Sequence, residues 1–119
     1  MTSRIDVPNI ETIFKIIDEL YEFSRRKSKL ELDIKIKESE INTKATNLEQ
    51  YFVGGKPPSQ TYIDNTWKYP GFDGELIPLR VELIEVSVEL EKRKFLFDAY
   101  KLWVDLYRTE SANERTSFV

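Results

Sequence analysis

The chain has 119 residues, 40% of them hydrophobic, which is enough for one small core and too little for two domains. It contains no cysteine and no histidine, which excludes disulfides, thiolate nucleophiles, Cys/His zinc sites and imidazole acid–base catalysis. With 18 basic and 21 acidic residues the net charge is -3, which excludes a protein that coats nucleic acid nonspecifically.

These exclusions indicate a protein that is not an enzyme. We expect no catalytic residues, no cofactor, no metal and no small-molecule substrate. The sequence has no run of about 18 to 20 apolar residues that would cross a bilayer, and its first residues lack the apolar stretch of a signal peptide. We therefore expect a cytoplasmic protein that makes no use of a membrane.

Residues 9 to 53 are predicted to be helical, beginning with Asn9 as the cap of the first turn. Apolar residues then follow at spacings of three and four, which predicts an N-terminal amphipathic helix. This row consists of Ile10, Ile13, Phe14, Ile17, Leu20 and Tyr21. The basic stretch at 24–29 leaves two alternatives open for residues 22 to 30, a bend or a continuous helix.

The segment from Leu30 to Lys37 alternates apolar and polar residues, which taken alone is typical of a strand. A helical row runs through the same segment and continues beyond it, and we favour the helix for this reason. That row consists of Leu30, Ile34, Lys37, Ile41, Ala45, Leu48 and Phe52. Because neither glycine nor proline occurs between Asn9 and Val53, we expect the helix to continue until Gly54.

Residues 54 to 74 hold all four glycines and three of the five prolines, which predicts a loop. The loop is rich in aromatic residues, namely Tyr62, Trp67, Tyr69 and Phe72. We expect these rings to pack on the helices or on a partner. Stacking of nucleobases on them is the alternative.

A second long helix is predicted over 75–109, with Asp73 as its cap, Pro78 in its first turn and a polar tail at 110–119. One apolar row on this helix is predicted to be an interface with other helices. It consists of Leu76, Leu79, Leu83, Val86, Leu90, Phe97, Tyr100, Trp103, Val104 and Tyr107. A second row widens the apolar face and indicates more than one partner helix. It consists of Ile77, Val81, Ile84, Val88, Phe95, Ala99, Leu102 and Leu106.

The predicted fold is therefore all-α, with residues 1–119 as a single helical domain. We expect an antiparallel hairpin of two long helices, with the N-terminal amphipathic helix folded against it. Self-association is expected to complete the fold, because a lone hairpin would leave much of the apolar surface of the second helix in water.

Basic residues from both long helices are predicted to meet in the middle of this hairpin. In an antiparallel hairpin that turns between residues 53 and 76, positions equally far from these two residues lie side by side. Lys37 then faces Lys92. The predicted phosphate-binding patch consists of Lys35, Lys37, Lys92, Arg93 and Lys94. The alternative is that Glu38, Glu40, Glu89 and Glu91 neutralise these cations as interhelical pairs.

The order of motifs along residues 30 to 115 resembles the UvsY recombination mediators of tailed phages. The matching segments are Leu48-Glu49-Gln50-Tyr51-Phe52, Gly55-Lys56-Pro57-Pro58, Tyr62, and Phe97-Asp98-Ala99-Tyr100 through Trp103. In that family basic residues stand directly before the aromatic pair, whereas here Lys44 is separated from Tyr51 and Phe52 by a segment with no basic residue.

This resemblance implies a homo-oligomer without enzymatic activity that binds single-stranded DNA in a bacterial or phage-infected cell. It implies two protein partners, a recombinase and a single-strand-binding protein. The mediator helps to load the recombinase onto strands that the single-strand-binding protein covers. Lys44 and Lys56 join the expected DNA-binding residues. The alternative is a structural or adaptor module that binds only proteins and no nucleic acid.

Overall fold

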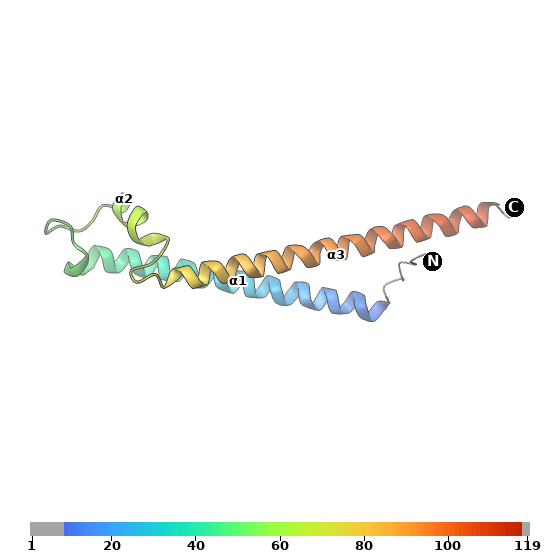
Figure 1. The fold of residues 1–119 in the computed structure, drawn as a ribbon, viewed down its shortest axis with the longest axis horizontal. Helices are drawn as coiled ribbons and strands as arrows, with labels where there is room; N and C mark the ends of the chain where they lie inside the picture. The colour runs from blue at the N-terminus through green and yellow to red at the C-terminus, as the bar shows by residue number, and fades with distance from the viewer. Residues whose placement is uncertain (1–8, 118–119) are drawn as a thin grey trace, which may run out of the picture. The chain divides into compact units, whose positions relative to one another are not determined.

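The computed structural model describes residues 9–117, and the chain is all-α over this range, with a single isolated bridge between Val53 and Lys56 as its only extended pairing. Figure 1 labels the three α-helices. The elements in chain order are α1 (Ile10–Asn47), a 3-10 turn η1 (Glu49–Tyr51), α2 (Gln60–Ile63), a π-helical turn η2 (Asp64–Lys68) and α3 (Leu76–Ser117).

Helix α1 begins where the sequence predicts. Asn9 Oδ1 accepts a hydrogen bond from the backbone N–H of Thr12 at 2.7 Å, which confirms the predicted cap. Residues 22 to 30 are continuous helix, so the predicted N-terminal amphipathic helix is wrong as a separate element and forms the first part of α1. The two serines in this stretch do not break the helix, because the stretch contains neither glycine nor proline.

The helix preferred over the strand for Leu30 to Lys37 is confirmed. Leu30 and Ile34 are 8% and 5% exposed, whereas Leu32 and Ile36 are 57% and 49% exposed. Burial therefore follows a spacing of four residues and not the alternation of two.

The prediction that the first helix continues to Val53 is wrong, because α1 ends at Asn47. Thr43 and Thr46 near this end donate their hydroxyl protons to the carbonyls four residues earlier, at 3.0 and 2.8 Å. Threonine and asparagine are weak helix formers, so this stretch has little intrinsic preference for continuing the helix. Leu48 then adopts an extended backbone, with φ -99 and ψ 122.

The chain divides into two compact units. The terminal unit contains residues up to Ser24 together with those from Val88 onward, and the central unit contains Arg25–Ser87. Each long helix therefore contributes one segment to each unit.

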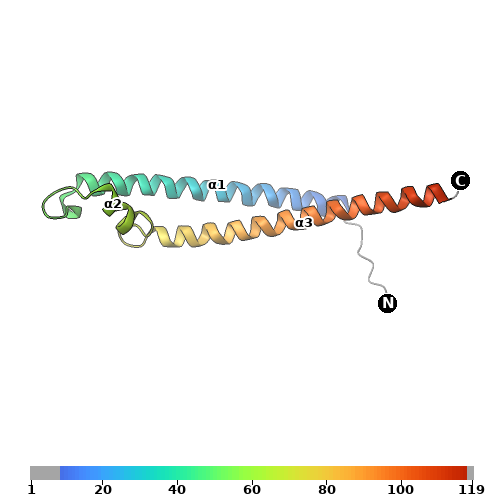
Figure 2. The same cartoon turned by 90° about the horizontal axis from the view of Figure 1, so that it is seen from above.

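The core of the central unit is built from both long helices and the connection between them. It consists of Ile34, Ile41, Ala45, Ile63 and Leu76, of which Ala45 and Leu76 are completely buried. The connection is not a simple loop as predicted for 54–74, because α2 and η2 lie within it and pack beside α1 (Figures 1 and 2). Ser59 caps α2 by accepting a hydrogen bond from the N–H of Tyr62 at 3.2 Å.

Three aromatic rings seal the core from the side of the connection. Tyr51 and Phe72 stack with ring centroids 3.9 Å apart, and Trp67 meets both rings edge-on. All three side chains are half-buried against the core. Trp67 and Phe72 therefore pack on the helices, as predicted, and do not form a free surface for stacking nucleobases.

The start of α3 is held by a carboxylate, but not by that of Asp73 as predicted. Glu75 accepts hydrogen bonds from the backbone N–H groups of Asp73 at 2.8 Å and Phe72 at 3.4 Å. These bonds lower the pKa of Glu75, with a smaller contribution from the charge of Lys37. Pro78 lies in the first turn of the helix, as predicted.

The lowered pKa of Glu75 predicts a pH dependence of stability. The ionised carboxylate stabilises the fold, so its contribution is complete above the ordinary pKa of 4.5 and is lost as pH falls through the lower pKa of the folded state. We expect the unfolding free energy of the wild type to fall more steeply below pH 4.5 than that of Glu75→Gln. Urea unfolding at a series of pH values measures both curves, and parallel curves contradict the prediction.

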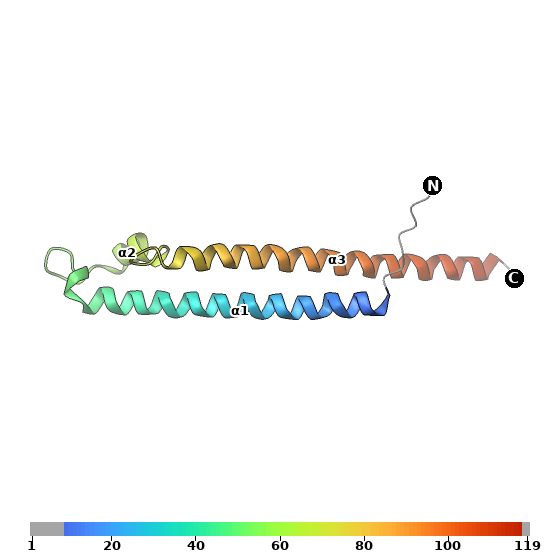
Figure 3. The same cartoon turned by 60° about the horizontal axis from the view of Figure 1, so that its bottom comes forward.

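The terminal unit is a simpler packing of two helix segments. Its buried apolar side chains, among the described residues, are Ile16 of α1 and Leu90 of α3, at 4% and 5% exposed. Helix α3 continues to Ser117, so the polar tail predicted at 110–119 is helical over its described part. Within this unit α3 extends beyond the first residue of α1 (Figure 3).

Candidate nucleic-acid interface

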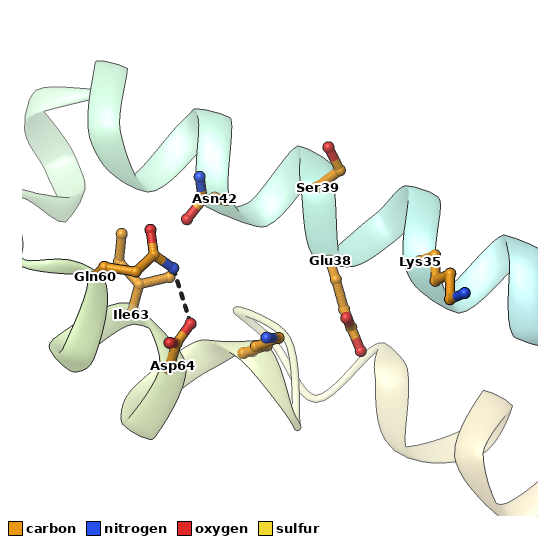
Figure 4. Close-up of a pocket in the computed structure, with 8 residues that line it drawn as sticks. Lys35, Glu38, Ser39, Asn42, Gln60, Ile63 and Asp64 are labelled. Atoms are coloured by element: carbon orange, nitrogen blue, oxygen red, sulfur yellow. Dashed lines mark hydrogen bonds between the residues drawn. The ribbon is translucent and has the colours of Figure 1, made fainter.

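A polar cleft of about 270 Å³ lies between α1 and the connection in the central unit (Figure 4). Four residues of α1 form one wall, and α2 and η2 form the other. The lining residues are Lys35, Glu38, Ser39, Asn42, Gln60, Ile63, Asp64 and Lys68. Because only Ile63 among them is apolar, the cleft is suited to a polar or charged ligand.

Both acidic residues of the cleft accept a hydrogen bond from a neighbouring side chain, but among the described residues only Glu38 is paired with a cation, because Gln60 is neutral. Glu38 Oε1 accepts from Arg80 Nη2 at 2.8 Å, and Asp64 Oδ1 accepts from Gln60 Nε2 at 2.8 Å. Lys35 and Lys68 make no ion pair with any described residue. The lysines are therefore the cations that the cleft offers to an incoming anion.

Asn42 adds an unsatisfied acceptor to this cleft. Its Oδ1 atom is buried and accepts no hydrogen bond from the described residues. A buried side-chain oxygen without a partner is costly, so Asn42 is an energetic cost in the wall of the cleft.

Arg80 organises the edge of the cleft, and sequence reasoning missed it. Besides its bond to Glu38, it donates to the backbone carbonyls of Tyr69 at 2.8 Å and Lys68 at 3.0 Å. Its guanidinium also lies 4.4 Å from the centre of the Tyr69 ring, which is 59% exposed. The available signal was that Arg80 is the only basic residue in the first four turns of α3.

The predicted DNA-binding residues of the central unit do not all meet at this cleft. Lys35 lines it, whereas Lys37 is half-buried and close enough to Glu75 to affect its pKa. Lys44 is exposed in the last turn of α1. Lys56 is exposed in a turn, where its backbone pairs with Val53.

The other three predicted residues lie in the terminal unit, where acidic residues neutralise two of them. Arg93 bonds to Glu89 at 2.6 Å and Glu19 at 2.8 Å, and these contacts raise the pKa of Arg93 and lower that of Glu89. Lys94 lies 3.4 Å from Glu91. The neutralising alternative thus holds for Arg93 and Lys94, but mainly through residues of α3 itself.

The predicted convergence of these cations with Lys35 and Lys37 is wrong in its register. Opposite Arg93 the residue of α1 is Glu19, and opposite Arg80 it is Glu38. The prediction assumed that α3 starts beside the end of α1. Instead the connection folds back along α1, and Leu76 packs in the core with Ile34 and Ile41, well before the end of that helix.

The row predicted as an interface between helices of different chains is partly covered within the chain. Leu76, Val86 and Leu90 are buried within a single chain, so for these three the prediction of an intermolecular interface is wrong. Leu79, Leu83, Phe97, Tyr100, Trp103 and Val104 are half-buried. Tyr107 is 57% exposed and stacks on Trp103 with centroids 5.7 Å apart.

Comparison of the chain with protein-family models, with curated proteins and with solved structures finds no match. Across residues 9–117, every helix is either too short or too polar to traverse a bilayer. The same range contains no cluster of three or more acidic side chains placed to hold a metal ion.

Proposed function

We propose that this protein is a self-associating helical accessory protein without enzymatic activity that binds single-stranded DNA. Its role is that of a UvsY-like recombination mediator, which helps to load a recombinase onto strands covered by single-strand-binding protein. The polar cleft of the central unit carries the proposal, because it presents Lys35 and Lys68, which form no ion pair with any described residue, beside the exposed amide of Gln60.

The proposed architecture is an antiparallel hairpin of α1 and α3, completed by self-association. Support comes from the ion pairs of the central unit, where Arg26 lies 3.7 Å from Glu82 and Glu38 lies 2.8 Å from Arg80. Later positions in α1 thus meet earlier positions in α3. Two antiparallel helices bury one side of each and leave their other sides for a further copy.

The composition of the cleft is compatible with a nucleotide of a flexible strand. Lys35 and Lys68 suit phosphate oxygens, and the exposed amide of Gln60, whose Nε2 is bound to Asp64, offers its oxygen to a donor on the edge of a base. The exposed ring of Tyr69, backed by Arg80, offers a surface on which a neighbouring base can stack. Single-stranded DNA supplies these groups together, because its bases are unpaired.

The test is fluorescence anisotropy with a labelled single-stranded oligonucleotide across a salt series. We expect the wild type to bind with an affinity that falls as salt rises, by a slope of about -0.7 per phosphate contact. The double variant Lys35→Glu/Lys68→Glu is expected to lose about tenfold or more in affinity at low salt, with a slope shallower by about 1.4.

The matched control is Lys15→Glu/Lys101→Glu, which makes the same change in charge at two exposed lysines of the terminal unit. Its salt slope is expected to stay near that of the wild type. Equal losses in both double variants would mean that net charge alone governs binding, which contradicts an assignment to the cleft.

An adaptor that binds only proteins is the second candidate. The neutralised Arg93 and the exposed apolar residues of α3 favour it. If the wild type shows no binding to the oligonucleotide at low salt, the mediator proposal fails and the adaptor stands.

A further inference from the structure

The terminal unit carries an uncovered apolar row on α3. Four large side chains of this row are highly exposed, with Val88 at 58%, Phe95 at 71%, Leu102 at 62% and Leu106 at 57%. Ala99 lies among them and is exposed as well. We call Val88, Phe95, Ala99, Leu102 and Leu106 the outer row.

The outer row faces away from α1. At 3.6 residues per turn, the buried Leu90 and the half-buried Phe97 and Val104 lie about half a turn around α3 from the outer row. Leu90 borders the same groove as Ile17 and Leu20 of α1, so this is the side of α3 that packs on α1 where the two helices run together. The outer row, by contrast, has no cover among the described residues.

The size of the outer row matches what a pair of chains needs. An aromatic side chain has roughly 150–250 Å² of surface, so Phe95 at 71% exposure leaves more than about 100 Å² in water. The smaller Val88, Leu102 and Leu106, at 57–62%, each leave about 100 Å² or somewhat less. Four such residues and their flanking atoms amount to about 500 Å² per chain. Two copies would bury about 1,000 Å², which is the lower bound for a specific interface.

The charges beside the outer row constrain how two copies can meet. One edge is acidic and consists of Glu91, Asp98 and Asp105, whereas the other edge carries Lys92 together with Leu96 and Trp103. In an antiparallel pair the acidic edges of the two copies would face each other. In a parallel pair each acidic edge lies beside the edge of the other copy that carries Lys92, Leu96 and Trp103, and Glu91 keeps its partner Lys94 on its own helix.

We propose that the outer row binds the outer row of a second copy of this chain, with the two α3 helices parallel and in register. This inference rests on the self-association included in the proposed function and is independent of the DNA-binding cleft. It assigns self-association to Val88, Phe95, Leu102 and Leu106, and not to the buried row with Leu76, Val86 and Leu90.

Cysteine cross-linking tests the parallel arrangement, because the chain has no cysteine of its own. The variants Val88→Cys and Leu102→Cys place thiols 14 residues, or about 21 Å, apart along α3. In a parallel pair each variant forms a disulfide-linked dimer on mild oxidation. In an antiparallel pair at most one of these two positions lies beside the same position of the second copy. If only one of the two variants forms the cross-link, the parallel arrangement is overturned. The control Lys101→Cys lies on the charged side of α3 and is expected to stay unlinked.

Light scattering after gel filtration tests the outer row itself. We expect the wild type to have at least twice the mass of one chain, and Phe95→Glu/Leu102→Glu to have the mass of one chain with unchanged helical circular dichroism. Leu32→Glu is the control, because Leu32 is an exposed apolar residue of the central unit at 57%, and its mass is expected to match the wild type. A monomeric wild type, or a double variant that still associates, overturns the inference.

The oligonucleotide assay separates this inference from the proposed function. Phe95→Glu/Leu102→Glu leaves the cleft residues unchanged, so it is expected to retain salt-dependent binding of the oligonucleotide. Association without DNA binding overturns only the cleft assignment, and DNA binding by a monomeric wild type overturns only the outer row.

Discussion

Replacing Leu76 by alanine is expected to lower the free energy of unfolding by about 3 kcal/mol. Among the residues that the structure describes, Leu76 is the largest completely buried side chain, and it packs in the core with Ile34, Ile41 and Ile63. The truncation removes apolar contacts and leaves a cavity that the surrounding helices can fill only in part. Because small proteins are stable by only about 5–15 kcal/mol, this loss is a large fraction of the total.

Urea unfolding followed by circular dichroism measures this loss, at one fixed protein concentration because self-association adds to apparent stability. Ile77→Ala is the matched control, since Ile77 is the next residue of the same helical turn and is 40% exposed. Its replacement is expected to change the free energy of unfolding by less than about 1 kcal/mol. Equal losses in the two variants would mean that the burial of Leu76 does not hold the central unit together.

The helices themselves could be predicted because their signals are local. The cap at Asn9 and the spacing of Leu30, Ile34 and Ile41 are read from neighbouring residues, and the structure confirms all of them. The end of α1 at Asn47 is harder to predict from the sequence, since no glycine or proline marks it. Its only signal is the weak helix propensity of the threonines and asparagines before it.

The register between α1 and α3 could not be predicted, because it depends on the path of the connection. The short helix α2 and the turn η2 occupy space beside α1, and the aromatic contacts of Tyr51 with Phe72 hold the connection against it. Nothing in the spacing of residues 54 to 74 specifies that path. An error in register moves every interhelical pair, which is why Arg93 meets Glu19 and not the region of Lys37.

The spacing on α3 predicts two apolar rows but does not decide which one α1 covers. The row of Leu76, Val86 and Leu90 and the row with Ile84 and Val88 have similar composition and similar steps. The choice is made by contacts with residues of α1 far away in sequence. For the same reason the cleft was found only in part, since Lys35 was predicted while Asn42 and Arg80 were not.

Replacing Gly71 by alanine is expected to lower the free energy of unfolding by about 2–3 kcal/mol, through two separable causes. Gly71 has φ 83, a left-handed conformation that costs other residues about 1–2 kcal/mol. A Cβ atom at this position would also lie 2.6 Å from the carboxylate of Glu75. That carboxylate would have to move, and it would lose its bonds to the N–H groups of Phe72 and Asp73.

Gly74 provides the control for the first cause alone. It has a similar φ of 73, but a Cβ atom there would meet nothing within 4 Å, so Gly74→Ala is expected to cost only about 1–2 kcal/mol. The second cause can then be isolated in a Glu75→Ala background, where no carboxylate remains to be displaced. In that background Gly71→Ala should cost no more than Gly74→Ala does, as measured by urea unfolding. If the cost of Gly71→Ala is the same with and without the carboxylate, Glu75 does not hold the start of α3, and the strain of the backbone accounts for the whole effect.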